Sequence, residues 1–356
     1  MIVVADTAKP PVSLAPIAAA VDGRIADLLE SELARWAEVD AELAAPFTVL
    51  RDLVLAGGKR LRPAFCHWAF VGAGGDPADP AVVDAGAGLE LLHTFALVHD
   101  DIMDGSATRR GAGTIHVQFQ ERHAIDGWRG EARRFGEGVA ILAGDLAFVY
   151  ADKMLQGAPA AALEVFTELR VEVNVGQYLD LVGTARGMAT EAVARRISVF
   201  KSGKYTVERP LHLGAALAGR LDELSGPLSA YGLPLGEAFQ LRDDLLGVYG
   251  DASVTGKPVG EDLREGKPTV LFAMAVERAE GPAVSVLERY GAADLAESEV
   301  VALQEVLAAT GAVAQVEARI DELVGEAMDA LHAAAVTDVA REELVELAHF
   351  VAGRDR

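Results

Sequence analysis

Apolar residues recur at helical spacing along almost the whole chain after residue 21. Ile25, Leu28, Leu29 and Leu33 begin this pattern, in which residues three and four positions apart share one face of a helix. The same period returns at residues 139–155, 161–181, 192–200, 235–248 and 313–331. Alanine and leucine dominate these segments, and they lack the alternating β-branched runs that indicate strands. The sequence therefore predicts an all-α fold of about ten or more helices.

The chain divides into a tail and one large domain. Residues 1–21 contain three prolines and little periodicity, so we expect a flexible N-terminal tail. Residues 22–356 show no short repeat and no shift in composition, which indicates a single helical domain. Glycine and proline interrupt the helical pattern at residues 72–80 and 250–268. The second interruption carries Lys257 and Lys267 and fits either a phosphate-binding lid or a plain connector.

Net charge and cysteine content limit the partners and the compartment. The 356 residues carry a formal net charge of −22, which repels nucleic acid and anionic lipid, although solubility alone also explains it. The single cysteine, Cys66, excludes an internal disulfide and a cysteine metal cluster. The N-terminus lacks the pattern of a signal peptide. The most apolar stretch, residues 85–98, contains Glu90 and His93. We therefore expect a cytoplasmic chain with no nucleic-acid partner and no stable membrane insertion.

Three aspartates close an apolar helix in the run LVHDDIMD. Asp100 and Asp104 lie four residues apart and share a helix face, with Asp101 beside them. Carboxylates this close repel one another unless a cation lies between them. Mg²⁺ suits such a place, because it takes one or two carboxylates together with substrate phosphates. A single motif of this kind is more often a solvated helix end.

A second motif, in the run FQLRDDLLG, strengthens the metal hypothesis. Gln240 and Asp244 lie four residues apart on one helix face, and Asp243 lies beside them. Two aspartate pairs at helix ends, far apart in sequence, can face each other across a cavity and hold a small cluster of Mg²⁺ ions. A diphosphate that bridges these ions would be bound by its charge.

Basic residues flank both aspartate motifs in an otherwise acidic chain. They are Lys59, Arg62, Arg109, Arg110, Lys201, Lys204, Lys257 and Lys267. Arginine binds diphosphate oxygens through two parallel hydrogen bonds, and lysine supplies a point charge. Each base alone would be read as a surface residue, but together with the aspartates they predict a diphosphate pocket. His93 lies seven residues before Asp100 on the same face, where a structural role and a ligand role are equally open.

Five ordered segments resemble the motifs of trans-isoprenyl diphosphate synthases, the polyprenyl synthetase family. They are GGKRLRP, HDDIMDGSATRRG, GQYLDL, FKSGKYT and FQLRDDLLGVYGDASVTGKPVGEDLREGKPT. The likeness runs from about residue 21 to the end of the chain, and the DDLLG form resembles that of actinobacterial geranylgeranyl or farnesyl diphosphate synthases. The resemblance implies a helical bundle around a central cavity, the isoprenoid synthase fold, and a homodimer.

The resemblance also implies a role for each matching residue. Mg²⁺, in a cluster of about three ions for which Mn²⁺ can substitute, would be held by Asp100, Asp101, Asp104, Asp243 and Asp244. The diphosphate of isopentenyl diphosphate would contact Lys59, Arg62, His93 and Arg110. The allylic diphosphate would contact Arg109, Lys201, Lys257 and Lys267. The reacting carbons would lie near Ser202, Gln240, Gln177 and Tyr205. The residues expected to act in catalysis are Asp100, Asp104, Asp243, Lys201, Ser202 and Gln240.

One position departs from the family pattern. The second motif often ends in an aspartate at its fifth position, where this chain has Gly247. One outer carboxylate is therefore missing from the predicted metal site. Because Mg²⁺ keeps water ligands readily, we expect water to fill the gap.

The residues before Asp100 bear on product length. Ala96 lies one turn before Asp100 on the same face and borders the expected path of the isoprenoid tail. In the resembling family, an aromatic pair at positions 95 and 96 marks many C15 synthases, and here only Phe95 is aromatic. Leu92 and Leu89 are candidates for the floor of the tunnel. We therefore predict geranylgeranyl diphosphate (C20) as the product of condensing isopentenyl diphosphate with allylic diphosphates, with farnesyl diphosphate (C15) as the alternative.

Two other functions remain as alternatives. A class I terpene cyclase shares the helical fold and one aspartate motif, but it needs neither GGKRLRP nor a second aspartate pair. A non-catalytic isoprenoid-binding subunit would have lost metal or diphosphate ligands, and nearly all are present here. Activity of the purified chain, with and without isopentenyl diphosphate, separates these three functions.

Overall fold

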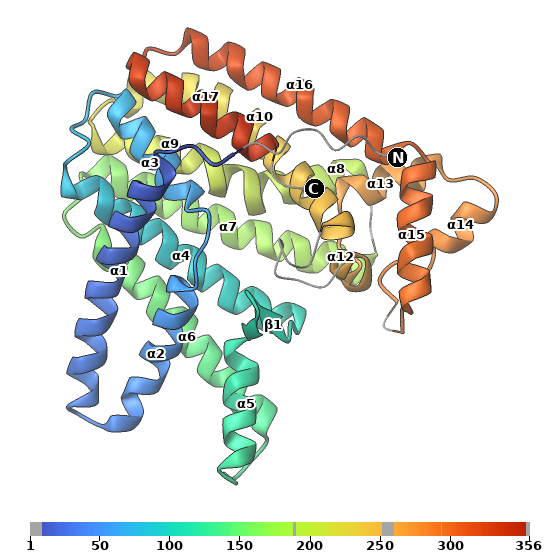
Figure 1. Ribbon diagram of the computed structural model, residues 1–356, viewed down its shortest axis with the longest axis horizontal. Coiled ribbons are helices and arrows are strands. Elements are labelled where there is room, and N and C mark those ends of the chain that lie inside the picture. The colour runs from blue at the N-terminus through green and yellow to red at the C-terminus, as the bar shows by residue number, and fades with distance from the viewer. Residues whose placement is uncertain (1–8, 188–189, 251–259, 293, 354–356) are drawn as a thin grey trace.

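Helices make up nearly all of the computed structural model, which describes residues 9–187, 190–250, 260–292 and 294–353. The helices of the N-terminal half are α1 (Leu14–Ala37), η1 (Ala41–Leu43), α2 (Ala44–Leu55), α3 (Leu61–Gly72), α4 (Pro80–Asp104), α5 (Ile115–Ile125), α6 (Ala132–Met154) and α7 (Ala160–Arg186). Those that follow are α8 (Glu191–Ser198), η2 (Val199–Glu208), α9 (Arg209–Leu217), α10 (Leu221–Tyr249), α12 (Glu261–Glu265), α13 (Val270–Arg278), α14 (Pro282–Leu287), α15 (Glu297–Ala309), α16 (Ala312–Ala333) and α17 (Asp338–Ala352). The all-α prediction is confirmed, and Figure 1 shows the long helices gathered into one bundle.

Within the described residues, a small hairpin is the one exception to the helical fold. Strands β1 (Thr108–Arg109) and β2 (Ala112–Gly113) pair antiparallel. The two turn residues, Arg110 and Gly111, both have positive φ, at 52° and 78°, as two-residue hairpin turns require. The hairpin follows α4 directly, so Arg109 and Arg110 lie close to the first aspartate motif.

The N-terminal boundary differs from the prediction. Helix α1 begins at Leu14, so a flexible tail over residues 1–21 is too long. Leu14 and Val21 are buried, and the Ser13 hydroxyl donates a hydrogen bond to Glu343 of α17 over 2.5 Å. Pro16 lies in the first helical turn, where a missing N–H removes no helical hydrogen bond. The prolines therefore limit where the helix starts without preventing it.

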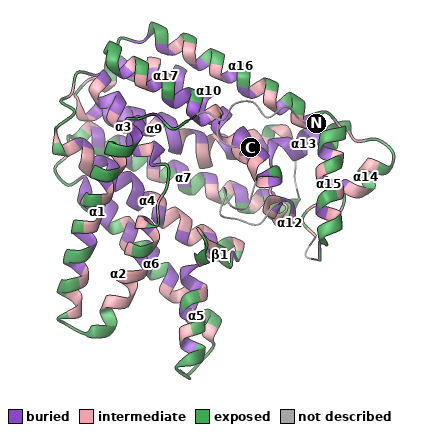
Figure 2. Ribbon diagram, in the orientation of Figure 1, coloured by how far each residue is buried: buried purple, intermediate pink, exposed green. Residues whose placement is uncertain are grey.

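Helix α4 carries the first aspartate motif and lies inside the bundle. It packs against α6, α3 and α1, and Figure 2 shows the buried residues gathered where such helices meet. By length and composition α4 could cross a membrane, and 61% of its most apolar stretch is buried in the structure. Helices α15 and α16 pass the same test only as a pair, which is bent by 60°. Packing against neighbouring helices accounts for the apolar sequence of α4.

Helix η2 is a π-helix between α8 and α9, and it carries the FKSGKYT motif. Two glycine contacts set its position. A Cβ atom on Gly176 of α7 would lie 2.5 Å from the backbone nitrogen of Lys201, and one on Gly236 of α10 would lie 2.6 Å from Cα of Gly203. Backbones approach this closely only where side chains are absent. The glycines therefore hold η2 tightly between α7 and α10.

Candidate active site

A cavity of about 150 Å³ lies between α4, α7 and η2. It brings together residues from four of the five sequence motifs. Its lining consists of Arg62, His93, Phe95, Ala96, Leu97, His99, Asp100, Met103, Val173, Asn174, Gln177, Lys201, Ser202 and Tyr205. Nine of the predicted site residues are in this set, and they combine charged groups with the apolar residues expected to border the tail.

Asp100 is the centre of a charged network at this cavity. Its Oδ1 accepts hydrogen bonds from Nε2 of Gln177 at 2.8 Å and from Nζ of Lys201 at 3.2 Å. Lys201 also donates to Oδ2 of Asp180 over 2.6 Å. Burial would raise the pKa of Asp100, but the charges of Lys201 and Lys267 lower it to about 2. Asp100 is therefore ionised at neutral pH, and Asp180, which the sequence reasoning missed, fixes the lysine beside it.

Asp104 lies one turn further along α4 and connects the first motif to α12. Its Oδ2 is 3.2 Å from Nζ of Lys267, which also lies 2.7 Å from Oε2 of Glu265. Burial would lower the pKa of Lys267, but the charges of Asp262 and Asp104 raise it well above the ordinary value. A protonated lysine thus stands beside each aspartate on the shared face of α4.

Asp101 does not join this face, in contrast to its predicted place among the metal ligands. It is buried, and its two carboxylate oxygens accept hydrogen bonds from Nε of Arg109 at 2.8 and 2.9 Å. A step of one residue turns a side chain by about 100° around a helix, away from Asp100 and Asp104. Asp101 instead positions Arg109, whose Nη2 lies 4.0 Å from Oδ2 of Asp100.

The second aspartate motif lies at the end of α10. Asp244 is buried and accepts a hydrogen bond from Nε2 of Gln240 over 2.8 Å. Burial, followed by the charges of Asp262 and Asp243, raises the pKa of Asp244 to about 8. Burial and nearby negative charge both disfavour the ionised form of this carboxyl group, whereas a bound cation would favour it. The α10 motif is therefore a place that a cation would stabilise.

These donors fit Mg²⁺ that binds together with a diphosphate. Within the described ranges, no three acidic, histidine or cysteine side chains are placed to hold a metal ion by themselves. Mg²⁺ commonly takes only one or two carboxylates and completes its shell with phosphate and water oxygens. Asp100 and Asp104 on α4, and Asp243 and Asp244 on α10, could serve as such pairs of oxygen ligands.

The GGKRLRP motif supplies bases on the other side of the cavity. Nη2 of Arg62 donates to the Thr206 hydroxyl over 2.9 Å, and its guanidinium lies 4.2 Å from the centre of the Tyr205 ring. Lys59 is exposed, with its ammonium 5.5 Å from the centre of the Phe350 ring on α17. Arg62 therefore reaches the cavity, whereas Lys59 stands outside its lining.

Arg110 and His93 complete the basic region. Nη1 of Arg110 donates to the Leu53 carbonyl over 3.0 Å. Burial and the neighbouring charge of Arg60 lower the pKa of Arg110. Burial and the charge of Arg62 lower the pKa of His93 well below its ordinary value, so the imidazole is neutral. The region therefore has an excess of positive charge that an anion would relieve.

Arg60 has a structural role that the sequence reasoning did not separate from its neighbours. It is buried, with a left-handed φ of 47°. Its guanidinium pairs with Glu90 at 2.7 Å and Asp22 at 2.8 Å, and donates to the Val54 carbonyl over 2.6 Å. Glu90 inside an apolar helix was the available signal, because a buried carboxylate needs a cationic partner. Arg60 thus fastens the GGKRLRP turn to α1, α2 and α4.

The remaining predicted residues lie around the cavity or beyond the described chain. The lining of the cavity does not include Arg109, Arg110, Asp104, Asp243 or Lys267. Lys257 lies outside the described residues. Leu89 and Leu92, the candidate floor, are fully buried in the core and do not line the cavity.

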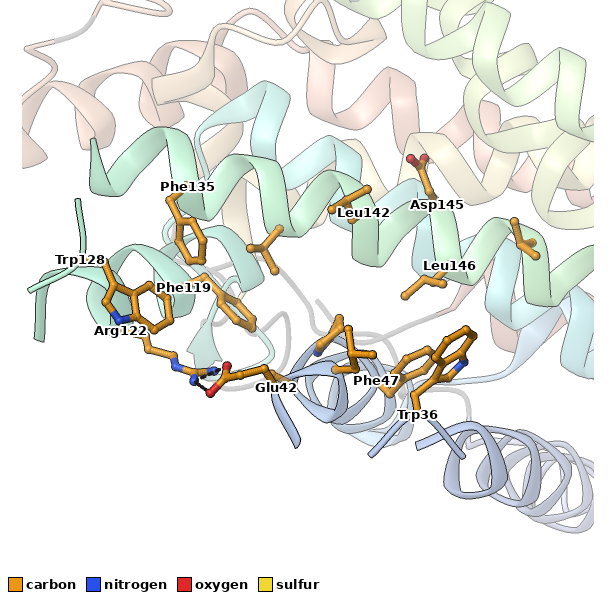
Figure 3. A pocket seen from close by; sticks show the side chains of 15 residues that line it. Trp36, Glu42, Phe47, Phe119, Arg122, Trp128, Phe135, Leu142, Asp145 and Leu146 are labelled. Atoms are coloured by element: carbon orange, nitrogen blue, oxygen red, sulfur yellow. Dashed lines mark hydrogen bonds and ion pairs between the residues drawn. The ribbon is translucent and has the colours of Figure 1, made fainter. Parts of the chain in front are cut away.

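A larger apolar pocket lies elsewhere and contains none of the motif residues. It measures about 490 Å³ and lies between the α1–α2 hairpin, α5 and α6. Figure 3 shows its aromatic lining, including Trp36, Phe47 and Trp128. Its arginine, Arg122, is already paired with Glu42 at 2.9 Å. The larger of these two pockets is therefore not the charged one. Because its arginine is already paired, this pocket has no free base to bind a diphosphate.

Comparison with known proteins assigns the family. The model of the polyprenyl synthetase family matches residues 47–308. A short chain isoprenyl diphosphate synthase of Methanothermobacter thermautotrophicus is 34% identical over 288 residues, which cover 73% of this chain and 82% of the relative. A (2E,6E)-farnesyl diphosphate synthase of Mycobacterium bovis is 30% identical over 307 residues, which cover 83% of this chain and 80% of the relative.

A solved structure agrees with this assignment. The geranylgeranyl pyrophosphate synthase of Corynebacterium glutamicum, complexed with isoprenyl diphosphate and magnesium, superposes with a TM-score of 0.91 at 38% identity. The match covers 96% of this chain and 99% of that one. The helical bundle of this chain therefore has the isoprenoid synthase fold. The chain belongs to the polyprenyl synthetase family and is a short-chain trans-prenyltransferase.

Proposed function

We propose that this chain condenses isopentenyl diphosphate with allylic diphosphates and releases geranylgeranyl diphosphate as its main product. The observation that carries this proposal is the cavity next to Asp100. Its lining includes the charged groups of Asp100 and Lys201 together with Phe95 and Ala96; Lys201 and a metal ion on Asp100 would bind the diphosphate, and Phe95 and Ala96 would border the tail.

The charged residues support binding of the allylic diphosphate at the aspartate motifs. Asp100 and Asp104 of α4, with Asp243 of α10, would hold Mg²⁺, which when bound draws charge from the diphosphate leaving group. Lys201 and Lys267 already lie beside Asp100 and Asp104. Their ammonium groups would move the short distance to the phosphate oxygens when metal binds.

The bases of the GGKRLRP turn support a separate site for isopentenyl diphosphate. Arg62 and the neutral His93 line the cavity, and Arg110 adds positive charge beside them. Two separate groups of charges allow two diphosphates to be held at once without direct repulsion. The double bond of isopentenyl diphosphate would then face the allylic carbon between the two groups.

The bond changes require a dry cavity. The allylic carbon–oxygen bond breaks with its electron pair on the diphosphate, and the double bond of isopentenyl diphosphate supplies the pair for the new carbon–carbon bond. A proton then leaves the isopentenyl part, and the released diphosphate is the base that accepts it. Ser202 and Tyr205 line the cavity, in which the reacting carbons would lie and from which water must be excluded, because water would trap the cation as an alcohol.

The choice of C20 over C15 depends on Ala96. The proteins to which this chain is similar include both a geranylgeranyl and a farnesyl diphosphate synthase, so family membership leaves the product length open. Ala96 and Phe95 both line the cavity one turn before Asp100. A small residue at position 96 leaves the path open for a longer tail. A farnesyl diphosphate synthase is the alternative.

Exposed apolar residues support the homodimer that the resemblance implies. Large apolar residues are exposed along α6 and α7, namely Ile141, Leu142, Val149, Val171, Val175 and Tyr178. A second copy of the chain would bury them. Light scattering at micromolar concentration should give the dimer mass, and a monomer alone would contradict this part of the proposal.

Product analysis tests the proposed function. The purified chain is incubated with Mg²⁺, labelled isopentenyl diphosphate and, in turn, dimethylallyl, geranyl and farnesyl diphosphate. We expect C20 as the main product from each primer after chromatography. A C15 main product would favour the farnesyl diphosphate synthase, and product without isopentenyl diphosphate would favour a cyclase.

A further inference from the structure

An ion network of charged and polar side chains joins α7, η2, α9 and α10. Its members are Glu172 of α7, Lys204 and Glu208 of η2, Arg209 and His212 of α9, and Ser229 of α10. None of these side chains lines the cavity next to Asp100. The bond changes proposed for this chain use none of them, so the ion network needs an explanation of its own.

Glu172 is the centre of the ion network. It is buried, and its carboxylate accepts two hydrogen bonds from Arg209, from Nε over 2.6 Å and from Nη2 over 2.7 Å. Its Oε1 also accepts a hydrogen bond from Nζ of Lys204. A buried carboxylate is stable only with such cationic partners. Glu172 therefore ties a lysine of η2 and an arginine of α9 to α7.

Glu208 and Ser229 complete the ion network. The Ser229 hydroxyl donates to Oε1 of Glu208 over 2.6 Å and lies 3.0 Å from Nε2 of His212. Oε2 of Glu208 lies 3.9 Å from Nζ of Lys204, and Nδ1 of His212 lies 3.4 Å from Nη1 of Arg209. Burial lowers the pKa of His212, so its imidazole is neutral at neutral pH. The ion network thus holds two carboxylates and two cations, and its charges balance.

One face of α7 carries the residues that meet η2. Glu172, Gly176 and Asp180 follow one another at intervals of four residues and share this face. Gly176 allows the backbone of Lys201 to approach, and Asp180 accepts a hydrogen bond from the Lys201 ammonium over 2.6 Å. Glu172 binds Lys204, three residues further along η2. Helix α7 therefore holds the π-helix at two lysines, with the close backbone contact between the two carboxylates.

The π-helix of η2 depends on restraint from its neighbours. It spans ten residues, Val199–Glu208, whereas π-helical turns are rare and occur mostly singly. Rare backbone conformations persist only where the surrounding structure fixes them. Without the carboxylate of Glu172, Lys204 and Arg209 would face each other inside the bundle with one negative charge too few. Their repulsion would loosen η2.

We propose that Glu172 is a positioning residue for the condensation reaction. By holding Lys204 and Arg209, it fixes the conformation of η2. The π-helix in turn presents Lys201 and Ser202 to the cavity. This inference rests on the proposed function, in which Lys201 binds the diphosphate that leaves the allylic substrate.

Glu172→Gln tests the proposal, because it removes the charge with little change of shape. The matched control is Glu32→Gln. Glu32 is buried on α1, does not line the cavity, and accepts hydrogen bonds from Nζ of Lys153 over 2.7 Å and from Nη1 of Arg35 over 3.2 Å. Both variants therefore remove a buried carboxylate that binds one lysine and one arginine.

A double variant, Glu172→Gln with Lys204→Gln, restores the charge balance of the ion network. Steady-state kinetics with geranyl and isopentenyl diphosphate give kcat and both KM values. Geranyl diphosphate is a primer for a C15 and for a C20 synthase, so the test does not depend on product length. Urea unfolding shows how much stability each variant loses and that it is folded in the assay.

The expected result is a loss of kcat that follows the charge balance. Glu172→Gln should lower kcat by about 100-fold, the effect of displacing a reacting group by about 1 Å. KM for isopentenyl diphosphate should change far less, because His93 and Arg110 belong to α4 and the hairpin. The double variant should recover about tenfold, a usual coupling within one ion network. Glu32→Gln should lose stability but keep the wild-type kcat.

Three results would overturn the inference. A wild-type kcat in Glu172→Gln would leave the ion network a purely structural role, and an equal loss of kcat in Glu32→Gln would show that the loss is not specific to η2. A double variant as slow as Glu172→Gln would exclude charge balance as the cause. If Glu172→Gln does not fold, the double variant decides alone, and a wild-type kcat in it would overturn the inference. Failure of the proposed function is distinct, because the wild type itself would then not condense isopentenyl diphosphate.

Discussion

Replacing Ala96 by phenylalanine tests how the cavity limits the product. The cavity next to Asp100 measures about 150 Å³, roughly the volume that holds one benzene molecule in an engineered apolar cavity. The substitution adds one six-carbon ring to a residue that lines this space. An isoprene unit has five carbons, so the new ring would take the room of about one unit.

The effect on the rate of chain extension is estimated from the tail carbons that the new ring excludes from the cavity. Burial of one carbon contributes about 0.8 kcal/mol, so five carbons contribute about 4 kcal/mol. At about 1.4 kcal/mol for each factor of ten, extension of a C15 tail to C20 should slow by roughly a thousandfold relative to release. Ala96→Phe should therefore change the main product from C20 to C15.

Chromatography of the products from each allylic primer measures this change. Ala308→Phe is the matched control, because Ala308 is exposed on α15 away from the cavity. Phe95→Ala should act in the opposite direction and lengthen the product, since it removes a ring that packs 4.9 Å from Phe148 at the cavity wall. An unchanged product distribution for Ala96→Phe would refute this account of the tunnel.

Three further predictions concern binding, metal and stability. Lys59→Ala and Arg62→Ala should raise KM for isopentenyl diphosphate more than KM for the allylic substrate, since each removes charge from one diphosphate site; steady-state kinetics that showed only an allylic effect would reverse the assignment of the two sites. Chelation with EDTA should abolish turnover, and Mg²⁺ or Mn²⁺ should restore it; activity that persisted would exclude the metal. Burial would raise the pKa of Glu172, but hydrogen bonds from Arg209 and Lys204 lower it below its ordinary 4.5. Its carboxylate therefore stabilises the fold above that pH and less as the pH falls. Glu172→Gln should cost about 3 kcal/mol of unfolding free energy at pH 7, and the difference should shrink in acid; an equal loss at all pH values in urea unfolding would contradict this.

The sequence predicted what depends on helical spacing. Asp100 and Ala96 lie on one face of a regular helix, so their shared place at the cavity follows from a separation of four residues. Gln177 and Lys201 were assigned through the family motifs, and the structure places both against Asp100. Residues within one helix, and residues carried by specific motifs, could therefore be placed before the fold was known.

The sequence could not predict features that depend on contacts between segments far apart in the chain. Asp101 is adjacent to Asp100 in sequence but pairs with Arg109, because the hairpin after α4 brings that arginine back. Gly247 was read as a lost ligand, whereas α12 places Asp262 in the same space. Helix α1 begins at Leu14 because its first turns pack on the bundle. In each case tertiary packing decides which neighbour a side chain meets.

Release of diphosphate from farnesyl diphosphate tests the central claim most directly. The purified chain is incubated with Mg²⁺ and farnesyl diphosphate, with and without isopentenyl diphosphate, and inorganic diphosphate is measured together with the C20 product. We predict that diphosphate is released only when isopentenyl diphosphate is present, in equal amount to the C20 product, and that Asp243→Ala loses both. Release without isopentenyl diphosphate, or no release from the purified chain when isopentenyl diphosphate is present, would contradict the proposed synthesis of geranylgeranyl diphosphate.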